Sequence, residues 1–214
     1  MDEALRLQAR TARASIASGT LRGAALLELV LSVPFLDRDV WLDELLGIEP
    51  PPEVPSLPRG SVPYLPCGVD EILAMVRDVP IGPDDELVDL GSGLGRPLVL
   101  AHLLSGARCR GVEIHEPLVA SARALCSALH LPAVTFEHAD ASESDLDGSV
   151  FFLYAPFNGD MLARVVRRLE EVARRRRIIV CTVGLELRDV AWLDAKSSSN
   201  VSLSLYTSNI ERHG

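Results

Sequence analysis

Three glycines at alternate positions form the part of this sequence that is best suited to hold a ligand. Gly91, Gly93 and Gly95 follow the apolar segment 86–90 and precede the apolar segment 98–104. Glycine permits positive φ angles and close approach of a ligand to the backbone, and the first turn of a helix offers unpaired N–H groups to an anion. The sequence therefore predicts a strand, a ligand-binding turn and a helix, in that order.

Charged side chains flank this turn on both sides. Asp89 stands two residues before Gly91, and Arg96 follows the last glycine directly. A cation at the start of a helix opposes the helix dipole, so we expect Arg96 to face a carboxylate. That carboxylate is either Asp89 or an acidic group of the bound ligand.

A further acid stands where the next strand should end. The segment 108–114 has the pattern of a strand, and Glu113 lies near its end, 22 residues after Gly91. In dinucleotide-binding folds, an acid at about this distance from the glycine turn accepts hydrogen bonds from ribose hydroxyls. We therefore expect Glu113 to bind a ribose.

The rest of the chain alternates strand and helix patterns, as a mostly parallel sheet requires. A hairpin near the C-terminus would close this sheet with antiparallel strands. The expected strands are 86–90, 108–114, 133–138, 149–155 and 178–183, then the hairpin 191–196 and 201–207, and the expected helices include 70–79, 117–129 and 159–173. These elements predict an α/β fold, with Asp70 as the cap of its helix.

The first 49 residues are expected to form a helical cap. Apolar residues recur at helical spacing over 5–16, 21–31 and 40–46, and Gly47 is placed to end the third helix. These helices could bury little surface by themselves, so we expect them to cover the main core. The alternative is a lid that shapes the substrate site.

Seven prolines crowd the segment 50–66, which predicts an extended linker ahead of a ligand-binding domain over 67–214. Tyr64 lies between Pro63 and Pro66 in this linker. A tyrosine held by prolines could close over a ligand, or it could only anchor the linker to the surface.

Composition excludes several classes of protein. The formal net charge of −9 argues against nucleic-acid binding that depends chiefly on electrostatic attraction. Cations favour helix C-termini, so the run Arg174–Arg177 does not by itself predict such binding. Glu28 interrupts the longest early apolar run, 26–33, so we expect neither a signal peptide nor a membrane span.

The sequence also indicates no metal site or disulfide. No histidine is spaced to join the acids of the segment 143–147 in a metal site. The four cysteines lack C-x-x-C spacing and are expected to be reduced, buried thiols in a cytoplasmic protein.

The glycine turn differs from the dinucleotide pattern G-x-G-x-x-G. Asp89-Leu-Gly-Ser-Gly-Leu-Gly-Arg96 resembles motif I of the class I S-adenosylmethionine (SAM) methyltransferases. With Tyr64-x-Pro66 and Gly111-Val-Glu113, the chain resembles small bacterial methyltransferases that are similar to mitochondrial lysine methyltransferases. The resemblance covers roughly residues 62–207 and implies a three-layer, Rossmann-like sheet beside the helical cap.

The resemblance also implies SAM as the cofactor and a role for each matching residue. Asp89 would lie beside the methionine part of SAM, and Asp140, which follows the third strand with Ala141, would bind the adenine amino group. The implied cofactor-binding residues are Tyr64, Asp89, Gly91, Gly93, Gly95, Arg96, Glu113, Asp140 and Ala141.

The end of the fourth strand, Tyr154-Ala-Pro-Phe-Asn158, is the usual place for substrate chemistry in this family. Amino-group methyltransferases often carry a D/N/S-P-P-Y/F signature there, and Ala155 replaces its polar residue. Cys67 likewise replaces the threonine of the family's Y-x-P-T pattern. Tyr154 and Asn158 are the candidates for orienting the acceptor.

The implied reaction is in-line transfer of a methyl group to a nucleophile. The expected acceptor is a nitrogen of a protein or peptide, because an acidic body attracts a basic target. One alternative is a small-molecule methyltransferase. A non-catalytic SAM-binding or partner protein, suggested by Ala155, is another, and a nicotinamide enzyme is the last.

Overall fold

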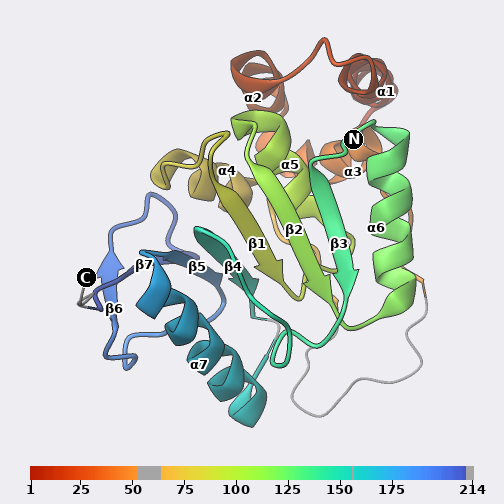
Figure 1. Ribbon diagram of the computed structural model, residues 1–214. Helices are drawn as coiled ribbons and strands as arrows, with labels where there is room; N and C mark the ends of the chain where they lie inside the picture. Colours follow the sequence, from red (N-terminus) through yellow and green to blue (C-terminus); the bar gives the residue numbers. More distant parts are fainter. Residues whose placement is uncertain (53–63, 156, 211–214) are drawn as a thin grey trace.

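The computed structural model describes residues 1–52, 64–155 and 157–210. Within these residues, seven strands form one sheet in the order β3-β2-β1-β4-β5-β7-β6 (Figure 1). Strands β1 to β5 run parallel to one another, and β7 is antiparallel to both β5 and β6. The strands are β1 (Glu86–Leu90), β2 (Arg108–Glu113), β3 (Val134–His138), β4 (Val150–Tyr154), β5 (Ile179–Val183), β6 (Leu193–Lys196) and β7 (Leu203–Ser208). The expected mostly parallel sheet with an antiparallel C-terminal hairpin is confirmed.

Strand β1 lies at the point where the order of the strands reverses. The chain passes from β1 to β2 and β3 on one side and then returns to place β4 on the other side of β1. Leu87, Val88 and Leu90 are fully buried, as expected for a central strand covered on both faces. In open α/β sheets, ligands bind beyond the carboxyl ends of the strands at such a switch point.

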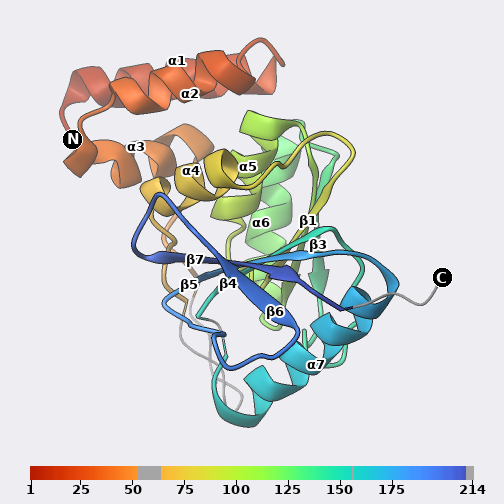
Figure 2. The same cartoon turned by 90° about the vertical axis from the view of Figure 1, so that its left-hand side faces the viewer.

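Helices cover both faces of the sheet and complete three layers (Figures 1 and 2). One hydrophobic cluster joins α4 (Val69–Asp78), α5 (Arg96–Ser105) and α6 (Glu116–Ala128) to one face. A second cluster joins α7 (Gly159–Arg175) to the other face, through buried residues at helical spacing such as Val165, Leu169 and Val172. The expected helices are therefore present, with boundaries shifted by a few residues.

The N-terminal cap consists of α1 (Glu3–Ala17), α2 (Gly23–Ser32), the short 3-10 helix η1 (Phe35–Asp37) and α3 (Arg38–Leu46). Figure 2 shows α1 and α2 together at one end of the sheet. The ring nitrogen Nδ1 of His130, just after α6, lies 3.0 Å from the carbonyl oxygen of Ala17. Since α6 runs back toward the amino ends of the strands, α1 and α2 lie away from the carboxyl edge where a ligand would bind.

The start of α4 differs from the expectation. Asp70 does not cap this helix, because the helix begins one residue earlier, at Val69, with Gly68 at the N-cap. The Oδ1 of Asp70 accepts a hydrogen bond from Nη1 of Arg38 at 2.7 Å. The backbone N–H of Val69 instead donates to Oδ1 of Asp39, a residue of α3, at 3.0 Å. A carboxylate from the N-terminal cap thus satisfies the first turn of α4.

The cysteines, the arginine run and the proline-rich linker were also singled out in the sequence. All four cysteines are free and buried, as expected. Arg174 pairs with Glu170 at 2.6 Å and Arg176 with Asp147 at 3.1 Å, so these arginines have local partners at the end of α7. No helix in the described parts of the chain is long and apolar enough to span a bilayer. The proline-rich linker predicted over 50–66 falls mostly outside the described residues.

Candidate functional site

The glycine turn has the backbone conformation that its sequence predicts. Gly91, Gly93 and Gly95 have φ angles of 86°, 51° and 77°, all in the left-handed region that favours glycine. The backbone N–H of Gly91 and that of Ser92 both donate to the carbonyl oxygen of Val112 at the end of β2, at 2.8 and 3.2 Å. The turn is therefore held directly above the carboxyl ends of β1 and β2.

Tyr64 covers this turn. A Cβ atom placed on Gly93 would overlap the Tyr64 ring, which means that the ring lies directly on the glycine backbone. Burial raises the pKa of the Tyr64 hydroxyl to about 12, so this side chain is a neutral phenol at physiological pH. Tyr64 was expected either to close over a ligand or to anchor the linker to the surface. A ring that lies on the glycine turn is placed for the first of these roles.

Glu113 joins the end of β2 to the glycine turn. Its Oε2 accepts a hydrogen bond from the backbone N–H of Gly93 at 2.9 Å. Its Oε1 accepts one from the backbone N–H of His115 at 3.0 Å and lies 2.7 Å from Nδ1 of the same residue. A carboxylate has about four acceptor positions, and these three contacts use three of them, so Glu113 has one position left for a ligand hydroxyl.

Asp89 has an unsatisfied oxygen beneath the turn. The residue is buried, and its Oδ1 has no hydrogen-bond partner among the described residues. Burial, and then the nearby charge of Glu113, raises the pKa of this carboxyl well above its usual range. A buried acceptor without a partner is costly, so this oxygen is suited to a cationic or hydrogen-bonding group of a ligand.

Arg96 is buried at the start of α5 and faces carboxylates, as expected, but these come from α3 and not from Asp89. Its Nη2 donates to Oδ1 of Asp39 at 2.7 Å and to the Asp39 carbonyl oxygen at 3.1 Å. Its Nε lies 3.6 Å from Oδ1 of Asp43, whose pKa is raised by burial and lowered less strongly by Arg96. Asp89 is not among the ion-pair partners of Arg96. The sequence suggested Asp89 because it is near in sequence, whereas the acids that bind Arg96 come from α3.

A cavity opens beside these residues at the carboxyl edge of the sheet. Its polar lining includes Glu113, His115 and Tyr64, and Tyr154 stands at the end of β4. Much of the remaining lining is apolar and comes from Ile114, Leu118, Ala141, Phe157 and Met161. The cavity thus combines an apolar part, which suits an aromatic base, with a carboxylate that suits a ribose.

The predicted site residues divide into those that line this cavity and those that support it. The lining residues are Tyr64, Gly91, Glu113, Ala141 and Tyr154. Asp89 is buried below the turn, and a Cβ atom on Gly95 would overlap the ring of Phe136, so Gly95 supports the turn by close packing.

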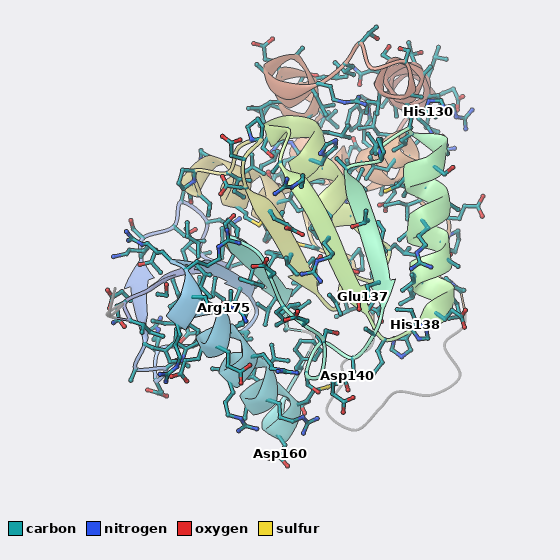
Figure 3. The ribbon with its side chains drawn as sticks, in the orientation of Figure 1. His130, Glu137, His138, Asp140, Asp160 and Arg175 are labelled. Carbon is teal, nitrogen blue, oxygen red and sulfur yellow. The ribbon has the colours of Figure 1, made fainter. Side chains whose placement is uncertain are left out.

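Two further predicted residues, Asp140 and Asn158, also lie outside the cavity lining. Asp140 lies just beyond β3 at the carboxyl edge (Figure 3), and its Oδ1 accepts a hydrogen bond from the backbone N–H of Ser142 at 2.7 Å. This bond forms an Asx turn. Asn158 is exposed at the N-cap of α7, where its side chain caps nothing. Neither residue is among those that line the cavity.

The end of β4 has an unusual backbone. Ala155 has a φ angle of 39°, which is rare for any residue other than glycine or asparagine. A Cβ atom on Gly184, at the end of β5, would lie 3.4 Å from the Cβ of Ala155. Backbone strain of this kind is concentrated at functional sites, where the surrounding structure maintains it.

The structure adds residues that sequence reasoning did not select. Asp39 and Asp43 of α3 contact Arg96 at the start of α5, and Gly184 lines the cavity from the end of β5. The first two gave no sequence signal, because an acid on a predicted surface helix is ordinary. Gly184 directly follows a predicted strand, and this position could have singled it out.

No family model and no curated protein matches this sequence. Solved structures do resemble it. An RNA methyltransferase from Salinibacter ruber, in complex with S-adenosyl-L-homocysteine, has a TM-score of 0.54 and 24% identity over 67% of this chain and 92% of that chain. A SAM-dependent methyltransferase from Aquifex aeolicus has a TM-score of 0.52 and 14% identity over 65% of this chain and 90% of that chain.

A third structure, precorrin-6y C5,15-methyltransferase from Geobacter metallireducens, has a TM-score of 0.52 and 16% identity over 71% of this chain and 93% of that chain. All three share the arrangement described above at low sequence identity, which establishes likeness of fold. The chain has the Rossmann-like fold of the SAM-dependent methyltransferases.

Proposed function

We propose that this protein is a SAM-dependent methyltransferase whose acceptor is a nitrogen atom of a protein or peptide. The observation that carries the proposal is the unpartnered Oδ1 of buried Asp89 below a glycine turn that is hydrogen-bonded to Glu113. The parts of SAM find matching groups at this switch point: the carboxylate of Asp89 can accept from the ammonium group, that of Glu113 from the ribose, and the apolar cavity suits the adenine.

Each part of SAM has a candidate partner among these residues. The α-ammonium group of the methionine part fits the unpaired oxygen of Asp89, because the cation would compensate the cost of the buried carboxylate. Glu113 has one acceptor position left, which would accept a hydrogen bond from a ribose hydroxyl. Ile114 and Leu118 supply apolar surface for the adenine, and Tyr64 would cover the cofactor. Asp140 and Arg96, which the resemblance implied as cofactor-binding residues, stay predictions.

When bound, SAM supplies an electrophilic methyl carbon, which an acceptor lone pair attacks while the carbon–sulfur bond breaks with its electron pair and leaves S-adenosylhomocysteine. The chain's main task is to align the acceptor with this carbon, and positioning of this kind is worth about 7–11 kcal/mol. Tyr154 lies at the end of β4 and lines the cavity, where its hydroxyl can orient the acceptor. Asn158, exposed on α7, is the weaker candidate.

An amine acceptor must lose its proton before it can attack, and the attack itself gives the product nitrogen a positive charge. The apolar side chains of Phe157 and Met161 border the cavity. Burial among such groups disfavours the charged amine and lowers its pKa. The released proton then passes to solvent or to a nearby carboxylate.

The acidity of the chain supports a basic acceptor. A net charge of −9 attracts a cationic protein segment and repels a phosphate backbone. For this reason we do not extend the RNA substrate of the Salinibacter ruber protein to this chain. A small-molecule acceptor is the second candidate, favoured by the apolar lining that Phe157 and Met161 give to the cavity.

Calorimetric titration of S-adenosylhomocysteine into the purified protein tests the proposal. We expect micromolar or tighter binding, which Asp89→Ala and Glu113→Ala abolish and Glu28→Gln, an exposed change on α2, leaves intact. Lysates incubated with labelled SAM would then show whether the methylated product is a protein or a small molecule. Absence of binding at millimolar ligand would overturn the proposed function.

A further inference from the structure

A second depression lies next to the cofactor cavity, between α4, the end of β4 and the C-terminal hairpin. Tyr154 and Gly184 line both spaces, so the two meet at the carboxyl ends of β4 and β5. The depression has a volume of about 850 Å³, larger than a single amine requires.

Four acids border this depression, and three of them have cationic partners. Asp39 binds Arg96 at 2.7 Å and Asp70 binds Arg38 at 2.7 Å. Glu186 binds Arg188 at 2.9 Å. These three acids therefore contribute little uncompensated charge.

Glu71 is the fourth acid and differs from the others. Among the residues that the structure describes, no cation lies within ion-pair distance of its carboxylate. Its Oε2 lies against the Cα of Gly68, since a Cβ atom there would overlap it. The charge of Glu71 also contributes to the raised pKa of Tyr154, after burial as the largest cause, so the carboxylate acts on the hydroxyl at the junction of the two spaces.

We propose that this depression is the acceptor site and that Glu71 binds the primary ammonium group of a lysine side chain before the amine enters beside Tyr154. The proposal rests on the proposed function, because it places the acceptor relative to the same cofactor cavity. Glu71 belongs to the first turn of α4, which gives the carboxylate a rigid support.

The rims of the depression indicate the kind of segment that presents the lysine. Phe35 is 67% exposed on one side and Val201 is fully exposed on the other, although both are apolar. An extended segment with an apolar residue near its lysine would cover these side chains while its ammonium group reaches Glu71. Charge and apolar surface together favour a basic peptide over a free amine.

The probe for this site is n-butylammonium chloride, which reproduces the end of a lysine side chain, with 1-butanol as the uncharged control. Amide chemical shifts of the ¹⁵N-labelled protein are followed by NMR, first with S-adenosylhomocysteine and then with added probe. We expect saturable shifts over residues 69–71 and at Tyr154 with butylammonium and not with butanol.

Variants then test the role of Glu71. Glu71→Gln should weaken butylammonium binding about fivefold, since one charge-assisted contact of about 1 kcal/mol is lost. It should leave the affinity for S-adenosylhomocysteine unchanged, and Glu28→Gln should change neither. Equal shifts with butanol, or unchanged butylammonium binding in Glu71→Gln, would overturn the acceptor site.

The cofactor titration separates the two proposals. If S-adenosylhomocysteine shifts the amides of Gly91–Gly95 but butylammonium finds no site at Glu71, the acceptor inference fails and the methyltransferase proposal stands. If S-adenosylhomocysteine shifts no amide at all, the methyltransferase proposal fails first. A butylammonium site at Glu71 in that case would be an amine site unrelated to methyl transfer, which contradicts the inference as stated.

Discussion

The backbone N–H of Gly93 donates to Oε2 of Glu113 at 2.9 Å, which holds the glycine turn onto the end of β2. The two residues are far apart in sequence but belong to adjacent parallel strands and their turns. The same carboxylate holds the backbone of His115 through its other oxygen. One side chain therefore joins the glycine turn to the backbone that follows β2.

The substitution Glu113→Gln should disturb this arrangement. An amide offers one acceptor oxygen where the carboxylate offers two, so either Gly93 or His115 loses its partner. A buried donor left without a partner costs about 1–3 kcal/mol. We expect a loss of unfolding free energy of that size by chemical denaturation, together with at least about tenfold weaker binding of S-adenosylhomocysteine.

Glu137→Gln is the matched control for this change. Glu137 lies on β3, is exposed (Figure 3) and pairs with Arg110 at 3.4 Å at the surface. It should change neither stability nor cofactor affinity appreciably, because exposed pairs contribute about 0–1 kcal/mol. Equal effects of the two substitutions would show that Glu113 does not organise the turn.

The substitution Asp89→Asn should stabilise the ligand-free protein while weakening cofactor binding. It removes a buried charge, and a gain of about 1 kcal/mol would raise Tm by about 2–4 °C in a chain of this size. Cofactor affinity should fall at least about tenfold, because the ammonium group loses its counterion. Thermal unfolding and calorimetry on the same samples would show both effects. A lower Tm for Asp89→Asn would contradict the interpretation that the buried, unpartnered carboxyl of Asp89 destabilises the folded protein.

The pH dependence of this effect has a definite sign. Because the folded-state pKa of Asp89 is raised above the ordinary value of 3.8, the folded protein holds a proton that the unfolded chain has released at any pH between these two pKa values. Its stability is then greatest below pH 3.8 and falls as pH rises through the window up to the folded-state pKa. The stability difference between Asp89→Asn and the natural sequence should therefore grow with pH. A constant difference would show an unshifted carboxyl.

The sequence predicted the sheet because its signals are local. Three alternating glycines, an acid at the end of the next strand and apolar runs of strand length each reflect a constraint carried by a few neighbouring residues. Glu113 and the glycine turn were identified in this way. The hairpin that closes the sheet followed from its alternation of apolar and polar residues.

The partners of Arg96 could not be predicted, because they depend on how the N-terminal cap packs. Asp39 and Asp43 are separated from Arg96 by more than fifty residues and by the proline-rich linker. The same limit explains why Asp70 was expected to cap α4, although Asp39 does so. Contacts between distant segments leave no local pattern.

The ion pairs of Arg96 give a third prediction. Arg96→Met leaves Asp39 and Asp43 without their cation; because these two side chains are 59% and 37% exposed, water compensates part of the loss and we expect a cost of about 1–2 kcal/mol. A double-mutant cycle with Asp39→Asn should give a coupling free energy of about 0.5–1 kcal/mol, measured by urea denaturation. Arg96→Lys, which keeps the charge, provides a folded variant if Arg96→Met does not fold.

The same variants distinguish two roles for Arg96. S-adenosylhomocysteine carries a carboxylate, whereas 5′-methylthioadenosine lacks the whole amino-acid part. If Arg96 acts by positioning the turn, Arg96→Lys should lower the affinity for both ligands by a similar factor. A loss confined to S-adenosylhomocysteine would show that Arg96 binds the ligand carboxylate instead.

The contact between Tyr64 and Gly93 gives the last prediction. In Gly93→Ala the new Cβ would overlap the Tyr64 ring, and the φ angle of 51° adds backbone strain. Gly19→Ala isolates the strain, because Gly19 has a φ angle of 77° and a Cβ there meets nothing within 4 Å. Strain alone costs about 1–2 kcal/mol, so Gly93→Ala should destabilise the protein more than Gly19→Ala does.

Binding separates these two alanine variants further. Gly93→Ala should weaken S-adenosylhomocysteine binding, because the displaced Tyr64 ring can no longer cover the turn, whereas Gly19→Ala, on the far cap, should not. Adding Tyr64→Ala to Gly93→Ala should recover part of the lost stability by removing the overlap, without restoring affinity. If Gly93→Ala behaves like Gly19→Ala in both denaturation and calorimetry, Tyr64 does not rest on the glycine turn in solution.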